Sequence, residues 1–214
     1  MTKNTTILVA DDHPILLKGL MDELDTAGYT LLEGAPNGAL ALNSILELRP
    51  DIAILDIEMP LLSGFEVIQK ANEKNVATKF IILTSHKERG YVVRAKKLNI
   101  SGYILKDEPF SELNNCIRAL LKDETYFSIT FDTIFKTEVT PELKKIKFLS
   151  PSERTIVRMV AQEKTSKEIS QLLSISLRTV QKHRANIISK LGLPASGDAL
   201  TIWTTENKEL ILSL

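Results

Sequence analysis

The first half of the chain alternates short apolar segments with amphipathic stretches long enough to form helices. The apolar segments read Ile-Leu-Val-Ala, Ile-Ala-Ile-Leu and Ile-Ile-Leu without polar alternation, which is typical of parallel strands covered on both faces. We expect strands at 7–10, 30–33, 52–55, 80–83 and 102–105, and helices at 14–25, 38–47, 64–73, 88–98 and 110–121. This alternation predicts an α/β doubly wound (βα)5 domain of about 120 residues.

The last third of the chain has helical periodicity without strands. A Ser-Pro-Ser-Glu sequence at 150–153 combines a helix N-cap, proline at the first helical position and a capping-box glutamate. Thr-Ser-Lys-Glu at 165–168 repeats the capping pattern, Ser176 can cap a third helix that stops at Gly192, and a fourth helix is expected at 196–206. These signals predict a smaller, all-α domain.

The domain boundaries follow from where these patterns change. We assign 1–121 to the α/β domain and 148–214 to the helical domain. Periodicity fades between them, over 122–147, and we interpret that stretch as a linker.

Composition limits the class of protein. The chain has 214 residues, of which 43% are hydrophobic and 25% charged, with 9 Gly and 8 Pro, so collagen-like and largely disordered proteins are excluded. No apolar run approaches the ~18 residues of a membrane helix, and the N-terminus lacks the apolar core of a signal peptide. We therefore expect a cytoplasmic protein. Cys116 is the one cysteine and the histidines number three and are scattered, which leaves no zinc ligand set.

Charge is distributed unevenly along the chain. The 27 basic and 27 acidic residues cancel, but 147–214 holds ten Lys and Arg against six Asp and Glu, whereas 1–121 holds thirteen against sixteen. A basic C-terminal region points to a polyanionic partner for that region.

Polar side chains follow four of the predicted strands. Asp11 and Asp12 follow the first strand, Asp56 the third, Thr84 the fourth and Lys106 the fifth. Because ligands bind at the carboxyl ends of strands in a doubly wound sheet, we expect these groups to converge at one edge. Clustered carboxylates favour Mg²⁺, and with the charge neutralised one carboxylate can attack phosphorus to form an acyl phosphate.

These motifs resemble a two-component receiver domain. The resemblance rests on Ile-Leu-Val-Ala-Asp-Asp-His at 7–13, the segment 51–60 followed by Ser-Gly at 63–64, Ile-Leu-Thr at 82–84 and Gly-Tyr-Ile-Leu-Lys at 102–106. It implies that Asp56 is the phosphoacceptor and that Mg²⁺ is held by Asp11, Asp12, Asp56 and the backbone carbonyl of Glu58. It further implies that Thr84 is the switch hydroxyl, Lys106 the phosphate-binding lysine and Tyr103 the aromatic switch residue.

The predicted helix at 177–191 has two distinct faces. Val180, Ile187 and Leu191 fall on one side of the helix. The opposite side carries basic, amide and small side chains without an acid, namely Arg178, Gln181, Lys182, Ala185 and Ser189. This strip suits a helix in the major groove of DNA, and the short link at 173–176 indicates a helix-turn-helix.

The helical region also resembles a LuxR-type DNA-binding domain, through motifs such as Thr-Val-Gln-Lys-His at 179–183 and Lys-Leu-Gly at 190–192. Glu163 stands where relatives commonly have glycine at the end of the first helix. By the resemblance, Gln181, Lys182 and Ala185 face bases and Thr179, Arg184 and Lys190 are candidates for phosphate contacts, beside Arg178 on the same strip.

Together the two regions resemble a NarL/FixJ-type response regulator. The resemblance implies a transcriptional regulator that is phosphorylated by a sensor histidine kinase, binds double-stranded DNA and forms a homodimer. Such a protein is no enzyme beyond its own Mg²⁺-dependent phosphorylation and dephosphorylation.

Two other interpretations stay open. A phosphohydrolase on a similar sheet would use Asp56 as nucleophile and Glu58 as general acid, and sustained turnover of a phosphate ester would identify it. A phosphorylation-gated interaction module would have a helical region that no longer binds DNA, and salt-independent DNA affinity would favour that interpretation.

Overall fold

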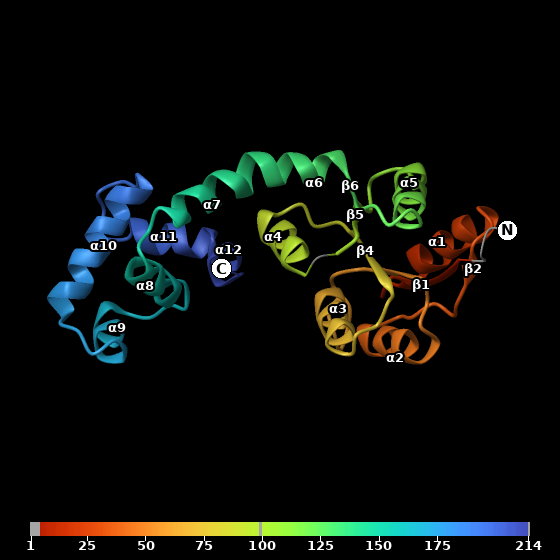
Figure 1. The fold of residues 1–214 in the computed structure, drawn as a ribbon, viewed down its shortest axis with the longest axis horizontal. Coiled ribbons are helices and arrows are strands. Elements are labelled where there is room, and N and C mark those ends of the chain that lie inside the picture. The colour runs from red at the N-terminus through yellow and green to blue at the C-terminus, as the bar shows by residue number, and fades with distance from the viewer. Residues whose placement is uncertain (1–4, 99, 214) are drawn as a thin grey trace. The chain divides into compact units, whose positions relative to one another are not determined.

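Parallel strands form one sheet in the N-terminal part of the chain (Figure 1). The computed structural model describes residues 5–98 and 100–213, so residues 1–4, Asn99 and Leu214 of the expected domains lie outside the described residues. The sheet contains β1 (Thr6–Ala10), β2 (Thr30–Leu31), β3 (Ile52–Leu55), β4 (Lys79–Thr84), β5 (Gly102–Leu105) and β6 (Tyr126–Phe127), in the order β2-β1-β3-β4-β5-β6. The predicted doubly wound α/β fold is confirmed.

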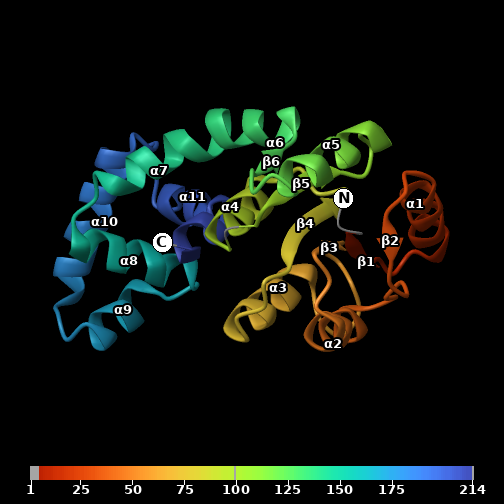
Figure 2. The same ribbon diagram turned by 45° about the vertical axis from the view of Figure 1, so that its right-hand side comes forward.

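Helices cover both faces of this sheet. They are α1 (Pro14–Thr26), α2 (Gly38–Leu48), α3 (Gly64–Glu73), α4 (Arg89–Lys97) and α5 (Phe110–Leu120). Leu24 of α1 and Ile117 of α5 pack in one buried cluster with Val9 and Ile54 of the sheet, whereas α2 packs on α3. Figure 2 shows α1 and α5 on one side of the strands and α2 and α3 on the other. The strands are buried on both faces, which explains their unbroken apolar sequences.

The stretch 122–147, in which helical periodicity fades and a linker is expected, is regular structure over most of its length. It contains β6, α6 (Ile129–Ile134), a π-helical segment (Phe135–Val139) and α7 (Thr140–Lys147). The sheet therefore has six strands, one more than the (βα)5 pattern predicts. A strand of two residues is too short to produce a periodic signal.

The chain divides into two units by its contacts. One unit comprises Met1–Lys87 and Ala95–Asp132, and the other comprises Glu88–Arg94 and Thr133–Leu214. The second unit contains α8 (Pro151–Ala161), α9 (Ser166–Leu172), α10 (Leu177–Leu191), α11 (Ala199–Glu206) and α12 (Lys208–Ser213). None of the described helices has the length and hydropathy needed to cross a membrane.

Capping sets the ends of these helices as the sequence predicts. Ser150 and Thr165 each accept a hydrogen bond from the backbone N–H of the third helical residue, and each capping box is complete. Gly192 ends α10 with a φ of 66°, in the left-handed region that glycine favours. Val180, Ile187 and Leu191 of α10 are buried, as the helical periodicity predicts.

Candidate functional site

An acidic pocket lies at the carboxyl ends of the central strands. Asp11 follows β1 and Asp56 follows β3, and both are nearly inaccessible, at 2% and 5% exposure. The Nζ atom of Lys106, which follows β5, lies 2.7 Å from Oδ2 of Asp11 and 2.8 Å from Oδ2 of Asp56. One ammonium group thus bridges two buried carboxylates that would otherwise repel each other.

Burial and the neighbouring charges shift the pKa values of Asp56 and Lys106 in opposite directions. Burial raises the pKa of the Asp56 carboxyl above its usual value, although the hydrogen bond from Lys106 and the backbone N–H of Ile57 oppose that shift. Burial also disfavours the charged form of Lys106, but its bonds to Asp11 and Asp56 outweigh burial and raise the pKa of the ammonium. Lys106 is therefore a firmly charged partner for oxygen atoms in the pocket.

The pocket also has the donor set of a cation site. Four potential ligand atoms lie within 4.8 Å of one another, one from each of Asp11, Asp12, His13 and Asp56. Oδ1 of Asp12 is buried and accepts no hydrogen bond from the described residues, although Nδ1 of His13 is 3.0 Å away. A buried carboxylate oxygen that accepts no hydrogen bond within the described part of the chain, beside two further carboxylates, fits a hard cation such as Mg²⁺.

The backbone around Asp56 is held closely by its neighbours. The backbone N–H of Ile57 donates to Oδ1 of Asp56 over 2.7 Å. A Cβ atom at Gly64 would lie only 2.2 Å from the carbonyl oxygen of Asp56, so the start of α3 requires glycine there. The Ser-Gly pair of the sequence motif thus brings α3 against the loop that presents the Asp56 carboxylate.

Glu58 and His86 stand opposite each other beside the pocket. Oε1 of Glu58 lies 3.0 Å from Nε2 of His86. Glu58 comes two residues after Asp56 and His86 two residues after Thr84. The structure thus brings together two side chains from the loops after β3 and β4, which the sequence does not show to be in contact.

Thr84 and Tyr103 are linked through the backbone of His86. The backbone N–H of His86 donates to Oγ1 of Thr84 over 3.3 Å, and the hydroxyl of Tyr103 donates to the carbonyl oxygen of His86 over 2.8 Å. Thr84 and Tyr103 are both buried. Tyr103 therefore points inward, with its hydroxyl fixed to the loop that follows β4.

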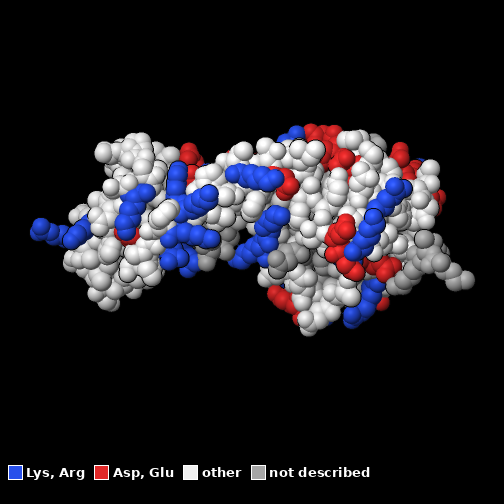
Figure 3. Space-filling model, turned by 45° about the horizontal axis from the view of Figure 1, so that its top comes forward, with Lys and Arg blue, Asp and Glu red and all other residues white. Residues whose placement is uncertain are grey.

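Helix α10 exposes the strip of side chains that is predicted to face DNA. The side chains of Arg178, Gln181, Lys182 and Ala185 are exposed, whereas those of Thr179 and Arg184 are half-buried. On the face of the molecule drawn in Figure 3, the charged side chains of the helical unit are mostly Lys and Arg, set among uncharged residues. The predicted base-reading residues therefore lie on an accessible surface.

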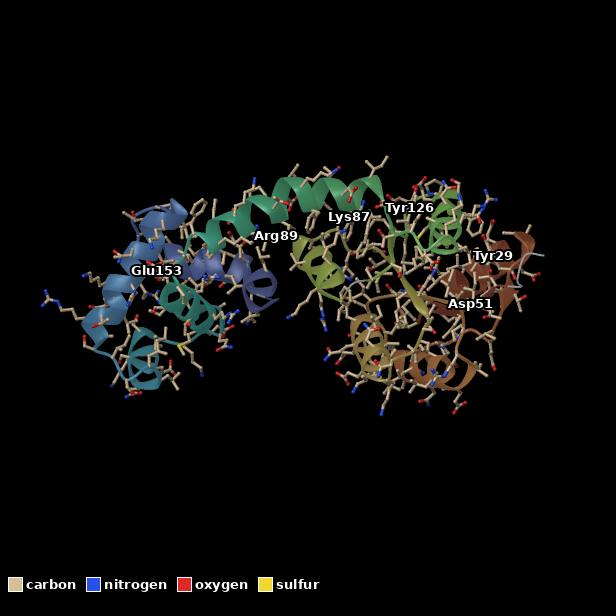
Figure 4. All side chains as sticks on the ribbon, viewed as in Figure 1. Tyr29, Asp51, Lys87, Arg89, Tyr126 and Glu153 are labelled. Carbon is tan, nitrogen blue, oxygen red and sulfur yellow. The ribbon has the colours of Figure 1, made fainter. Side chains whose placement is uncertain are left out.

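The three candidate phosphate contacts have partners within the helical unit. Oγ1 of Thr179 lies 2.8 Å from Oγ of Ser176, the N-cap residue of α10, and Arg184 donates to Oγ1 of Thr201 over 3.4 Å. Lys190 lies 2.7 Å from Oε2 of Glu153, which is labelled on α8 in Figure 4. These contacts join α10 to the rest of the helical unit, and no local sequence signal reveals the last two.

Family models match both parts of the chain. The model of the response regulator receiver domain matches residues 7–118. The model of the bacterial regulatory proteins of the luxR family matches residues 147–202.

Several known proteins are similar to this chain over most of its length. The transcriptional regulatory proteins YvfU and DesR of Bacillus subtilis are 35% and 32% identical to it, over 92% of this chain and 95% and 94% of theirs. The oxygen regulatory protein NreC of Staphylococcus epidermidis is 31% identical, over 87% of this chain and 91% of its own.

A solved structure has the same fold along nearly the whole chain. RcsB from Salmonella enterica serovar Typhimurium, bound to a promoter in the presence of a phosphomimetic, superposes with a TM-score of 0.64 at 24% identity, over 95% of this chain and 99% of its own. As its motifs predict, the chain belongs to the NarL-type response regulators, in which a receiver domain precedes a LuxR-family DNA-binding domain.

Proposed function

We propose that Asp56 accepts a phosphoryl group from a sensor histidine kinase and that this modification controls binding of the chain to double-stranded DNA. The observation that carries the proposal is the Lys106 ammonium, which lies between the buried carboxylates of Asp56 and Asp11. The proposal assigns phosphoryl acceptance to 1–121 and DNA binding to 148–214, with 122–147 between them.

The reaction is a transfer between a nitrogen and an oxygen atom. A carboxylate oxygen of Asp56 forms a bond to phosphorus while the P–N bond of the kinase phosphohistidine breaks, and the imidazole nitrogen keeps the electron pair. Lys106 and the hydroxyl of Thr84 then bind phosphoryl oxygens. Asp11, Asp12, Asp56 and the backbone carbonyl of Glu58 would hold Mg²⁺, which neutralises charge on the transferred group.

The proposed DNA contacts come from α10. Its exposed strip carries two basic side chains, an amide and a methyl group, which are the groups that read a major groove. The matching RcsB structure contains promoter DNA, which supports the same activity here. A homodimer would present two such helices to the half-sites of an inverted repeat. The cytoplasm is the proposed location, where a kinase and genomic DNA are both within reach.

A selection experiment tests modification and DNA binding together. The full chain is incubated with acetyl phosphate and Mg²⁺, its intact mass is measured, and bound fragments of genomic DNA are then selected at physiological salt. The Asp56→Ala variant removes the acceptor, and Asp107→Ala is the matched control because Asp107 pairs with Lys87 at an exposed position.

We expect the wild-type chain and Asp107→Ala to gain a phosphoryl group and to enrich a short inverted repeat, and Asp56→Ala to do neither. DNA enrichment by Asp56→Ala equal to that of the modified wild type would contradict control by phosphorylation. Enrichment by no variant would favour the interaction module. Continued hydrolysis of the phosphodonor far beyond one equivalent would favour the phosphohydrolase.

A further inference from the structure

The segment Tyr126–Phe131 extends the sheet next to Tyr103. Tyr126 pairs with Gly102 and Phe127 with Tyr103 in a parallel register. The backbone N–H of Ser128 donates to the carbonyl oxygen of Tyr103 over 3.1 Å. The main chain of the proposed switch residue is therefore bonded to a segment that follows α5 and lies beyond the receiver match at 7–118.

The side chain of Tyr103 contacts the same segment. Its ring centroid lies 4.7 Å from that of Phe131, and the Phe131 ring lies 4.8 Å from that of Phe127 in a stacked arrangement. Nζ of Lys96 lies 3.5 Å from the Phe127 centroid, a distance suited to a cation–π interaction. Tyr103 and Phe131 are each 1% exposed, so neither ring can leave without disturbing the other.

The start of α6 is fixed at the same place. The hydroxyl of Ser128 accepts a hydrogen bond from the backbone N–H of Phe131 over 3.3 Å. The carbonyl oxygen of Ser128 accepts a second one from the backbone N–H of Asp132 over 3.0 Å. Ser128 is buried. Because Phe131 lies in the first turn of α6, the ring that touches Tyr103 belongs to the helix that continues the chain.

Tyr103 is in turn bonded to the loop that carries Thr84. The Tyr103 hydroxyl donates to the carbonyl oxygen of His86, whose N–H donates to the hydroxyl of Thr84. A Thr84 hydroxyl that turns toward a phosphoryl group would change how the backbone of His86 is held. The backbone N–H of Lys106 in turn donates to the carbonyl oxygen of Thr84 over 2.8 Å. A chain of contacts therefore leads from Lys106 to α6 through Thr84, His86, Tyr103 and Phe131.

We infer that docking of the segment Tyr126–Phe131 is coupled to the inward position of the Tyr103 ring, so that the two occur together. We call this segment the latch. Displacement of the ring undocks the segment, and displacement of the segment frees the ring. The inference rests on the proposed function for its link to Asp56, but the coupling between ring and segment exists in the unmodified protein. Phe131 is by this inference a positioning residue, which acts through Tyr103.

The first test observes the ring while the segment is changed. The full chain is labelled with 3-fluorotyrosine, and the ¹⁹F resonance of Tyr103 is assigned with the Tyr103→Phe variant. In Phe131→Leu, we expect this resonance to move toward that of an exposed tyrosine and to gain a shift between H₂O and D₂O. The matched control is Phe65→Leu, which removes an equally buried ring on α3.

The second test changes the ring and observes the segment. In Tyr103→Leu, the amides of residues 128–134 should exchange with deuterium about tenfold faster or more, because removal of a buried aromatic ring weakens local packing. The control is Tyr29→Leu, since Tyr29 also anchors its hydroxyl, to Asn114 over 2.6 Å, at a separate place in the same unit. Figure 4 labels Tyr29 and Tyr126, which mark the two places.

Equal exchange of 128–134 in Tyr103→Leu and Tyr29→Leu would overturn the coupling of the latch to Tyr103, as would an unchanged Tyr103 resonance in Phe131→Leu. If Tyr103→Leu unfolds the whole unit, the fluorine experiment on Phe131→Leu decides. Both measurements use the unmodified protein. A failure of Asp56 to accept phosphate, seen in the intact mass, would therefore contradict the proposed function while the coupling of the latch is decided separately.

Discussion

The ammonium of Lys190 lies 2.7 Å from Oε2 of Glu153, a carboxylate whose side chain is only 4% exposed. The same carboxylate oxygen accepts a hydrogen bond from the backbone N–H of Ser150 over 2.7 Å, so it closes the capping box of α8 as well. One buried oxygen thus ties the first turn of α8 to the last turn of α10. This bond therefore helps to hold α10, the helix proposed to contact DNA, against α8.

The first prediction concerns the contribution of Lys190 to stability. Lys190→Met leaves the buried Glu153 carboxylate without its cation and should lower the free energy of unfolding by about 1–2 kcal/mol at pH 7. Urea denaturation measures this loss. Lys208→Met is the control, because Lys208 pairs with a Glu163 side chain that is 80% exposed, and it should change stability by about 0.5 kcal/mol or less.

The Lys190 effect should also depend on pH. Burial alone would raise the pKa of Glu153, but the bonds from Lys190 and Ser150 outweigh it and hold the pKa below its ordinary 4.5. A carboxyl group whose pKa is lower in the folded state stabilises the fold at pH values above its unfolded-state pKa. This stabilisation is lost as the pH falls through the folded-state pKa. The difference between wild type and Lys190→Met should therefore shrink below pH 4.5. A difference that grows there would contradict the assignment.

The second prediction separates DNA binding from stability. Lys182 is exposed on α10 and is proposed to face bases, so Lys182→Met should leave unfolding unchanged and weaken binding to the selected repeat by about 1–3 kcal/mol more than binding to unrelated DNA. Fluorescence anisotropy with both DNAs at one salt concentration measures this difference. Lys208→Met removes the same charge from α12 and should keep the wild-type preference for the repeat. An equal loss on both DNAs in Lys182→Met would exclude a base contact by Lys182.

Local sequence signals predict much of this molecule, because caps, strand ends and buried strands depend on neighbouring residues. The carboxylates after β1 and β3 meet at one edge, since parallel strands all end there. Local signals do not predict three features, namely the two-residue strand β6, the contact of Phe131 with Tyr103 and the bond of Lys190 to Glu153. Each of them joins residues distant in sequence or forms too short an element to give a periodic pattern.

Glu163 shows how a local signal and a distant contact combine at one residue. The family resemblance places glycine at this position, and Glu163 indeed has a φ of 63°, in the left-handed region. Its carboxylate lies 2.9 Å from Nζ of Lys208 on α12, which the sequence does not indicate.

The third prediction follows from that backbone angle. Glu163→Gly should raise the free energy of unfolding by about 0.5–1 kcal/mol, because glycine adopts the left-handed conformation without the strain of a Cβ atom. Glu163→Gln keeps the strain and loses only the exposed ion pair, so it should alter stability by at most about 0.5 kcal/mol. Thermal and urea unfolding of the two variants provide the measurement. A less stable Glu163→Gly would show that the bond to Lys208 outweighs the strain.

The fourth prediction concerns the cation in the acidic pocket. Lys106→Met leaves the buried carboxylates of Asp11 and Asp56 facing each other and should lower the free energy of unfolding by about 3 kcal/mol at pH 7. Lys87→Met is the control, because Lys87 and Asp107 form a pair whose side chains are 52% and 63% exposed, and it should cost about 0.5 kcal/mol or less.

Protons and divalent cations should both reverse the Lys106→Met defect. Burial already raises the pKa of Asp56 above its ordinary 3.8, and loss of Lys106 raises it further. A carboxyl group whose pKa is raised in the folded state destabilises the fold when it is ionised. This destabilisation disappears as the pH falls through the folded-state pKa. The deficit of Lys106→Met should therefore be smaller at pH 5 than at pH 7. Mg²⁺ at pH 7 should stabilise this variant more than Lys87→Met, since it binds the folded pocket. A deficit that neither acid nor Mg²⁺ reduces would show that Lys106 stabilises the pocket through packing rather than charge.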